Sequence, residues 1–128
     1  MNNNKTAIIT GAGTGIGKGI ALKFAANNFN LILASRNVDN LNQVKKECDL
    51  LNNDSNYVIQ TDIIDEKSVE NLFVESKSKF GKIDALINNS GVFDGGAIDE
   101  MSVETWDKVI NVNLRGAFLC LRQAMKLM

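Results

Sequence analysis

Four glycines stand at alternate positions in the stretch Thr-Gly-Ala-Gly-Thr-Gly-Ile-Gly, residues 10–17. A short β-branched and apolar run at 6–10 precedes them, and 16–25 follow with apolar side chains at helical spacing. The glycines therefore lie in a turn between a strand and a helix, where backbone can approach a ligand because no Cβ intervenes. The helix N-terminus directs free N–H groups and the positive end of its dipole at the same turn. This arrangement predicts an anion site, most often one for a nucleotide phosphate.

The spacing of these glycines distinguishes the turn from two common phosphate-binding motifs. It does not meet the Gly-x-Gly-x-x-Gly dinucleotide fingerprint, and it is not a P-loop because Lys18 is followed by Gly19. The pattern present is Thr-Gly-x-x-x-Gly-x-Gly. A flexible glycine-rich turn without a ligand is the alternative, and the strand and helix on either side argue against it.

Length and charge restrict the class of protein. The 128 residues suggest a single domain, and 45% hydrophobic with 23% charged residues fits a soluble globular protein. The net charge is −1 with no block of like charge, so neither nucleic acid nor an anionic membrane is indicated as a partner. No apolar run approaches the ~20 residues that span a bilayer, and the start of the chain lacks the apolar stretch of a signal peptide. We therefore expect a cytoplasmic protein.

Two side-chain types exclude further chemistry. Histidine is absent from the sequence, which removes the commonest general base and metal ligand. No carboxylate cluster has the spacing of metal ligands, so no metal site is predicted. Cys48 and Cys120 lie far apart at apolar helical positions and are interpreted as buried thiols.

Apolar runs and turn residues predict three further strands, at 30–35, 57–61 and 84–88, separated by helices. Asn37, Asp65 and Ser102 are expected to cap the second, third and last helices, while the first helix ends near 27–28 and the third at Gly81. Strands that alternate with helices indicate a parallel sheet covered by helices. The predicted apolar faces of the helices comprise Ile16, Ile20, Ala21, Phe24 and Ala25; Leu41, Val44, Cys48 and Leu51; Val69, Leu72, Phe73, Ser76 and Phe80; and Trp106, Val109, Ile110, Ala117, Phe118 and Leu121, with Asn113 within the last stripe and expected to be buried.

Ser35 and Arg36 follow the second strand, about 20 residues after the glycines, where dinucleotide folds meet the adenosine ribose. An acidic residue there would accept hydrogen bonds from a free 2′-hydroxyl and favour NAD. A guanidinium can instead pair with a 2′-phosphate. The sequence therefore favours NADP(H), with NAD(H) open as the alternative. If Arg36 binds no ligand, it is a solvated arginine at a strand end.

The fourth strand runs into Asn88-Asn-Ser-Gly91. In an open α/β sheet this strand lies beside the first strand across the topological switch point, so its carboxyl end borders the ligand crevice. Asparagine side chains can tie the two strand ends together, and Gly91 leaves room for a cofactor ribose. An ordinary turn is the alternative.

The ordered motifs resemble the short-chain dehydrogenase/reductase family, in particular 3-oxoacyl-(acyl-carrier-protein) reductases. They are 10–17, Arg36, Asp62, Asn88–Gly91 and the Asn-x-x-Gly of Asn113–Gly116, with Ser90 where the family carries Ala. The resemblance implies a Rossmann-type doubly wound parallel sheet of strand order 3-2-1-4, truncated before a fifth strand. Residues 1–128 would then be the dinucleotide-binding, N-terminal part of a longer single domain.

The resemblance also implies residue roles. Asp62 would contact the adenine amino group, Ile63 would pack on the ring, and Asn113 would belong to the catalytic tetrad, where it helps hold a water in a proton relay. The expected cofactor-binding residues are Gly11, Gly13, Thr14, Gly15, Ile16, Gly17, Ser35, Arg36, Asp62, Ile63, Asn89, Ser90 and Gly91.

The family's catalytic Ser and Tyr-x-x-x-Lys are not found in these 128 residues, since Tyr57 is the only tyrosine and has no lysine four positions later. We interpret Tyr57 as a packing residue. We expect the chain to be the cofactor half of an NADP(H)-dependent reductase or dehydrogenase of small carbonyl or alcohol substrates, which at full length would form a homo-dimer or homo-tetramer. A non-catalytic NAD(P)-binding module is the alternative. An S-adenosylmethionine-binding Rossmann protein is disfavoured because Thr10 opens the turn and Arg36 replaces the acidic ribose ligand.

A truncated sheet has structural consequences. The fourth strand would keep an open edge, and the last helix would carry an apolar face without a partner. We therefore expect the isolated chain to be poorly stable or to aggregate.

Overall fold

The computed structural model describes residues 4–128, so residues 1–3 of the predicted domain lie outside the described part of the chain. Four parallel strands form one sheet in the order β3-β2-β1-β4, as the family resemblance implies. Each crossover between parallel neighbours contains a helix, which places the carboxyl ends of all the strands at one edge of the sheet. The strands are β1 Thr6–Thr10, β2 Asn30–Ser35, β3 Asn56–Gln60 and β4 Ala85–Ile87.

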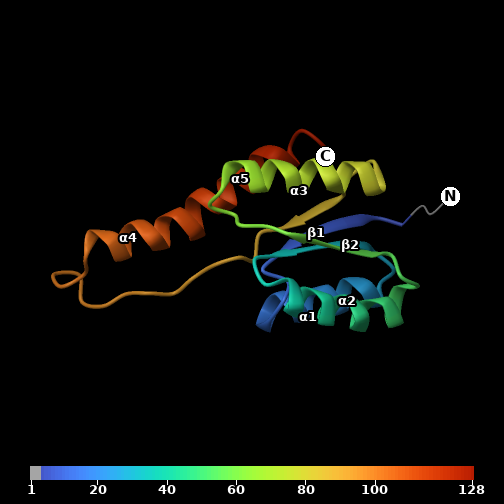
Figure 1. Ribbon diagram of the computed structural model, residues 1–128, viewed down its shortest axis with the longest axis horizontal. Helices are drawn as coiled ribbons and strands as arrows, with labels where there is room; N and C mark the ends of the chain where they lie inside the picture. The colour runs from blue at the N-terminus through green and yellow to red at the C-terminus, as the bar shows by residue number, and fades with distance from the viewer. Residues whose placement is uncertain (1–3) are drawn as a thin grey trace.

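Helices cover both faces of this sheet. In Figure 1, α1 and α2 lie on one face and α3 and α5 on the other, while α4 extends away from the sheet. A π-helix, η1, joins α4 to α5 and was not predicted. The bounds are α1 Gly15–Ala26, α2 Val38–Asn52, α3 Glu66–Phe80, α4 Val103–Ile110, η1 Asn111–Gly116 and α5 Ala117–Ala124.

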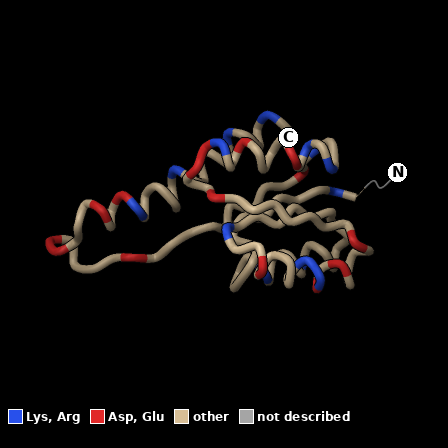
Figure 2. The backbone as a smooth tube through the Cα atoms, viewed as in Figure 1, with Lys and Arg blue, Asp and Glu red and all other residues tan. Residues whose placement is uncertain are grey.

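The predicted helix ends are confirmed by their capping contacts. The side chains of Asn37, Asp65 and Ser102 each accept a hydrogen bond from a backbone N–H in the first turn of α2, α3 and α4. Asn28 and Gly81 adopt positive φ angles of 61° and 78° after α1 and α3. Charges of both signs are interspersed along the helices (Figure 2), in accordance with the net charge of −1.

Alternate residues of the strands supply two cores. Ile8 and Ile32 face the layer of α3 and α5, whereas Ile9, Leu31 and Leu33 face α1 and α2. Both thiols are buried, Cys48 in the second core and Cys120 in the first. Burial raises the pKa of each thiol to about 11, so both are protonated at neutral pH, as expected of packing residues.

In the predicted apolar faces of the first two helices, two residues are exposed. Ile16 is 77% exposed, because it lies in the first turn of α1, beyond the carboxyl end of the sheet. Leu51 is 46% exposed, because the neighbouring Asn52 takes the buried position at the end of α2. There Asn52 and Asn56 exchange two hydrogen bonds of 2.7 and 2.6 Å. A reciprocal amide pair can thus occupy a buried site that hydropathy assigns to leucine.

The strand bounds and the role of Tyr57 need smaller adjustments. Strand β3 begins at Asn56, one residue earlier than predicted, and β4 contains three residues, not five. Tyr57 packs edge-on against Phe80 with ring centroids 5.4 Å apart, which confirms its interpretation as a packing residue.

The expected open edge and unpartnered helix face are both present. Among the described residues, β4 pairs only with β1. Helix α4 has no buried residue, and Trp106, which belongs to its predicted apolar face, is exposed. Trp106, Leu114, Phe118 and Leu121 are 51–64% exposed along α4, η1 and α5.

Asp84 fixes the register between β1 and β4. Its Oδ2 accepts a hydrogen bond from the Thr6 N–H at 2.8 Å, and its own N–H donates to the Thr6 carbonyl at 2.8 Å. The Thr6 N–H, together with the Lys82 ammonium 3.1 Å from Oδ1, holds the pKa of the Asp84 carboxyl below its usual range.

We predict that Asp84→Asn flattens the acid side of the pH–stability profile. Because the folded pKa lies below the unfolded value of about 3.9, the carboxylate contributes stability that is fully present above that value and is lost as pH falls through the folded pKa. Urea unfolding between about pH 6 and about pH 3 should therefore show a smaller loss of unfolding free energy for the variant. Asp99→Asn is the control, since Asp99 is exposed and makes no hydrogen bond or ion pair within residues 4–128. Identical profiles for wild type and Asp84→Asn would contradict the prediction.

Candidate functional site

A cavity of about 400 Å³ lies at the carboxyl ends of the strands. The loops after all four strands line it, and the opposite wall comes from α4 and η1. Seven predicted cofactor residues meet here: Gly11, Ser35, Arg36, Asp62, Ile63, Ser90 and Gly91. Five other lining residues were missed because no motif marks them: Thr61, Ile64, Val92, Lys108 and Val112.

A second recess of about 220 Å³ adjoins the glycine turn. The predicted residues Gly13 and Thr14 line it, as do residues 35–37. Asn40 also lines it and was not predicted. The remaining predicted positions, Gly15, Ile16, Gly17 and Asn89, line neither space. Two of these four, Gly17 and Asn89, build the frame around the turn.

Close packing explains two glycines of the turn. A Cβ on Gly17 would lie 2.1 Å from the Gly11 carbonyl oxygen, so only glycine lets α1 begin against the turn. Gly11 has a φ of +63°, and a Cβ there would lie 2.8 Å from Asn89 Nδ2. The turn therefore depends on the absence of side chains for its own shape.

Asn89 ties the end of β4 to the end of β1, as the sequence predicts. Its Nδ2 donates to the carbonyl oxygens of Thr10 and Gly11, both at 3.1 Å. The N–H groups of Asn89 and Ser90 both donate to Thr10 Oγ1 at 3.1 Å. The two strand ends are thereby locked together beside the cavity.

The N-terminus of α1 differs from those of α2, α3 and α4. Thr14 occupies its N-cap position without a side-chain hydrogen bond to the helix, whereas side chains cap α2, α3 and α4. The first-turn N–H groups of α1 thus have no side-chain cap in the described chain, and Thr14 itself lines the recess. Such N–H groups, with the helix dipole, favour an anion.

Arg36 supplies a positive charge to both spaces. Its side chain is exposed and, within residues 4–128, makes no hydrogen bond or ion pair. Its backbone is held in place, because Gln60 Nε2 donates to the Arg36 carbonyl at 3.0 Å. The guanidinium is therefore available to an anionic group on a ligand.

Asp62 and Ile63 form the part of the wall that follows β3. Asp62 Oδ1 accepts a hydrogen bond from the Ile64 N–H at 3.2 Å, and the Asp62 N–H donates to Ser68 Oγ at 2.9 Å. Ile63 is buried against Gly116, where an added Cβ would lie 2.7 Å from Ile63 Cδ1. This contact gives a physical reason for the glycine of the Asn-x-x-Gly motif.

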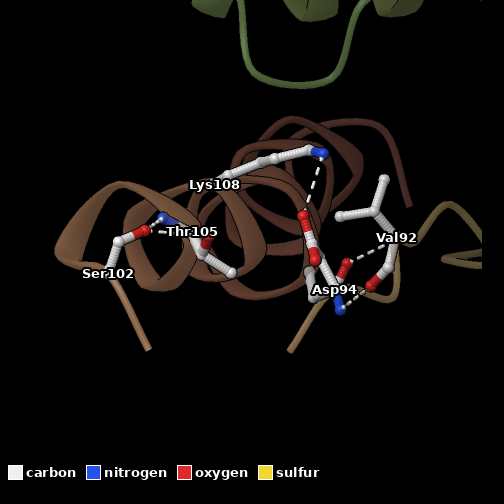
Figure 3. Close-up of polar contacts among 6 residues, drawn as sticks. Val92, Asp94, Ser102, Thr105 and Lys108 are labelled. Atoms are coloured by element: carbon white, nitrogen blue, oxygen red, sulfur yellow. Dashed lines mark hydrogen bonds and ion pairs between the residues drawn. The ribbon is translucent and has the colours of Figure 1, made fainter. Parts of the chain in front are cut away.

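Asn113 lies in η1 and grips the loop after β4. Its Oδ1 accepts from the Val92 N–H and its Nδ2 donates to the Val92 carbonyl, both at 2.8 Å. The prediction that Asn113 is buried is wrong, since its side chain is exposed as it reaches across to this loop. Figure 3 shows these bonds at Val92 beside the ion pair of Lys108 with Asp94, at 3.5 Å. π-Helical turns are rare and often lie at functional sites.

Two structural absences concern the described residues alone. No group of three or more acidic or cysteine side chains within 4–128 could hold a metal ion. None of the helices in that range has the length and hydropathy needed to cross a bilayer.

The fold and the site define a Rossmann-type protein with a nucleotide-sized cavity at the switch point of its sheet. The chain matches the short chain dehydrogenase family over residues 5–128. It therefore belongs to this family of oxidoreductases with an NAD(P)-binding Rossmann fold.

Named relatives agree with this assignment. An uncharacterized oxidoreductase of Thermotoga maritima is 36% identical over 123 residues, which cover 95% of this chain and 47% of that protein. The uncharacterized oxidoreductase YxbG of Bacillus subtilis is 38% identical over 128 residues, covering 98% and 46%. The narrower resemblance to 3-oxoacyl-(acyl-carrier-protein) reductases stays a prediction.

Solved structures are similar over the same extent. An alcohol dehydrogenase from the archaeon Thermococcus sibiricus, complexed with 5-hydroxy-NADP, superposes with a TM-score of 0.93 at 30% identity, covering 98% of this chain and 53% of that one. Levodione reductase gives a TM-score of 0.92 at 30% identity, covering 97% and 49%. The chain spans about half the length of these relatives.

The packing of the glycine turn predicts opposite effects for two substitutions in α1. Gly17→Ala should lower the unfolding free energy by about 1–3 kcal/mol, because its Cβ would overlap the Gly11 carbonyl. Gly19→Ala should raise it by up to about 1 kcal/mol, because its Cβ meets no atom within 4 Å and alanine favours the helix. Urea denaturation measures both. Equal effects of the two substitutions would refute this account of the turn.

Proposed function

We propose that this chain forms the cofactor-binding part of a cytoplasmic oxidoreductase that transfers hydride between NADP(H) and a small carbonyl or alcohol substrate. The observation that carries the proposal is the convergence of four features at one cavity: the glycine turn, Arg36, Asp62 and the Ser90–Gly91 loop. The nicotinamide cofactor, when bound, supplies or accepts the hydride. At full length the protein would act as a homo-dimer or homo-tetramer.

The residues present fit such a cofactor. The uncapped first turn of α1 and the turn at 11–15 suit the pyrophosphate, because both offer backbone N–H groups without intervening side chains. The unpaired Arg36 guanidinium suits a 2′-phosphate, which makes NADP(H) the preferred cofactor over NAD(H). Asp62 and Ile63 would receive the adenine. Ser90 and Gly91 would border the nicotinamide ribose, and Asn89 would hold this loop against the glycine turn.

Asn113 would take part in the proton relay that the family resemblance implies. Both polar atoms of its side chain hold the Val92 backbone, which fixes the loop beside the cavity. Its Oδ1 has a second lone pair, so it can still accept a hydrogen bond from a water. The group that protonates the substrate would come from outside these 128 residues, since they contain no Tyr-x-x-x-Lys.

A non-catalytic NAD(P)-binding module is the second candidate, because the cavity with the expected cofactor residues lies within these 128 residues. The two candidates differ in turnover. An oxidoreductase consumes NADPH in the presence of some member of a carbonyl panel, whereas a binding module binds NADPH without consuming it.

Substitution of Arg36 tests the cofactor preference. Arg36→Ala should weaken NADPH binding about 10–100-fold, since it removes a charge-assisted pair worth about 1.5–3 kcal/mol. NADH, which has no 2′-phosphate, should bind with unchanged affinity. Titration of the nicotinamide fluorescence measures both dissociation constants.

Lys23→Ala is the charge-matched control, because Lys23 is exposed on α1 and lines neither space at the strand ends. It should leave both affinities unchanged. Tighter binding of NADH than NADPH by the wild type, or an equal loss for both cofactors in Arg36→Ala, would overturn the preference for NADP(H).

A further inference from the structure

Arg115 connects the two walls of the cavity. Its Nη1 donates to the Ile64 carbonyl at 2.8 Å, across 51 residues of sequence. Ile64 lines the wall that follows β3, whereas η1, which carries Arg115, contributes Val112 to the opposite wall. The hydrogen bond therefore fixes one wall against the other.

The bond also acts on Asp62 through a short relay. The Ile64 N–H donates to Asp62 Oδ1 at 3.2 Å, while the Ile64 carbonyl accepts from Arg115. Residue 64 is thus held at its carbonyl by Arg115, and its N–H contacts the Asp62 carboxylate. The backbone of this loop is tied further by the Asp65 N–H, which donates to the Asp62 carbonyl at 3.1 Å.

Arg115 is not required to satisfy a buried group. Ile64 is 42% exposed, so water could hydrogen-bond its carbonyl in the absence of the arginine. Within residues 4–128, the side chain of Arg115 has no carboxylate partner, in contrast to Arg122 on α5, which pairs with Glu66 on α3. We therefore expect the hydrogen bond from Arg115 to fix the position of the loop at Ile64 and to contribute little to the free energy of unfolding.

We propose that Arg115 is a positioning residue for adenine recognition, which acts through Ile64 to orient the Asp62 carboxylate toward the adenine amino group. The inference rests on the proposed binding of a nicotinamide adenine dinucleotide. It adds a residue of the π-helix, outside the cavity lining, to the determinants of base specificity.

Comparison of two dinucleotides measures this role. NADPH carries the adenine amino group, whereas reduced nicotinamide hypoxanthine dinucleotide phosphate has an oxygen in its place. The wild type should bind NADPH more tightly, because a carboxylate accepts from the amino group and repels the oxygen. Arg115→Ala should weaken NADPH binding about three- to tenfold and change binding of the hypoxanthine analogue less than about twofold.

Three further variants separate position from stability. Arg115→Met keeps the aliphatic stem without a donor and should behave as Arg115→Ala does, and Arg115→Lys keeps a donor and should restore part of the discrimination. Arg122→Ala removes the neighbouring tie between α5 and α3 and should leave the discrimination unchanged. Reduced nicotinamide mononucleotide, which lacks adenine, should bind all variants equally.

The outcomes distinguish this inference from the proposed function. Failure of the wild type to bind either dinucleotide overturns both. Binding of NADPH without preference over the hypoxanthine analogue overturns the adenine contact and the role of Arg115. A preference that survives in Arg115→Ala and Arg115→Met, or that Arg122→Ala reduces equally, overturns the role of Arg115 alone.

Discussion

The hydrogen bonds of Thr10 and Asn89 join the carboxyl ends of β1 and β4, and we call this contact the seam. It lies at the topological switch point, where the strand order of the sheet reverses. The Thr10 hydroxyl accepts from two successive N–H groups after β4, and the Asn89 amide donates to two successive carbonyls after β1. A crevice at such a switch point opens because the flanking helices lie on opposite faces of the sheet. The seam also supports the glycine turn, because Gly11 packs directly on Asn89 and Ser90.

The π-helix performs the corresponding task on the far side of the cavity. Within six residues it presents Asn113 to the loop after β4 and Arg115 to the loop after β3, and Gly116 lets it pack on Ile63. Three loops that belong to separate crossovers are thereby fixed by two structures, the seam and the π-helix. The hydrogen bonds of Asn113 and Arg115 go to backbone atoms of these loops, so they do not occupy the loop side chains.

The helix caps and most of the cavity lining could be predicted from the sequence because they depend on local signals, whereas the sheet order follows from the family resemblance that the ordered motifs carry. Glycine spacing, apolar runs and capping residues are each readable within about ten residues. The failures share a different cause. Burial of Asn52 in place of Leu51 depends on a partner, Asn56, whose position is set by another strand. The π-helix contains one extra residue per turn, which the apolar periodicity of the sequence does not reveal. The contact of Arg115 with Ile64 joins residues that are 51 positions apart, so no local pattern predicts it. Helical spacing predicts which face of α1 is apolar, but it does not predict how far the sheet extends under that face, and Ile16 is exposed.

Frame and specificity are separable in this fold. The atoms that shape the turn and the seam are used within the protein, by close packing at Gly17 and by hydrogen bonds at Asn89. Arg36, by contrast, faces the cavity with its guanidinium unpaired among the described residues, and Asp62 uses one carboxylate oxygen in its own loop. A change at Arg36 is therefore expected to leave the strand ends undisturbed, whereas a change at Gly17 is expected to disturb them. Arg115 belongs to neither class: its hydrogen bond goes to the Ile64 backbone, but its proposed role is to position Asp62, which would extend the determinants of base specificity to the π-helix.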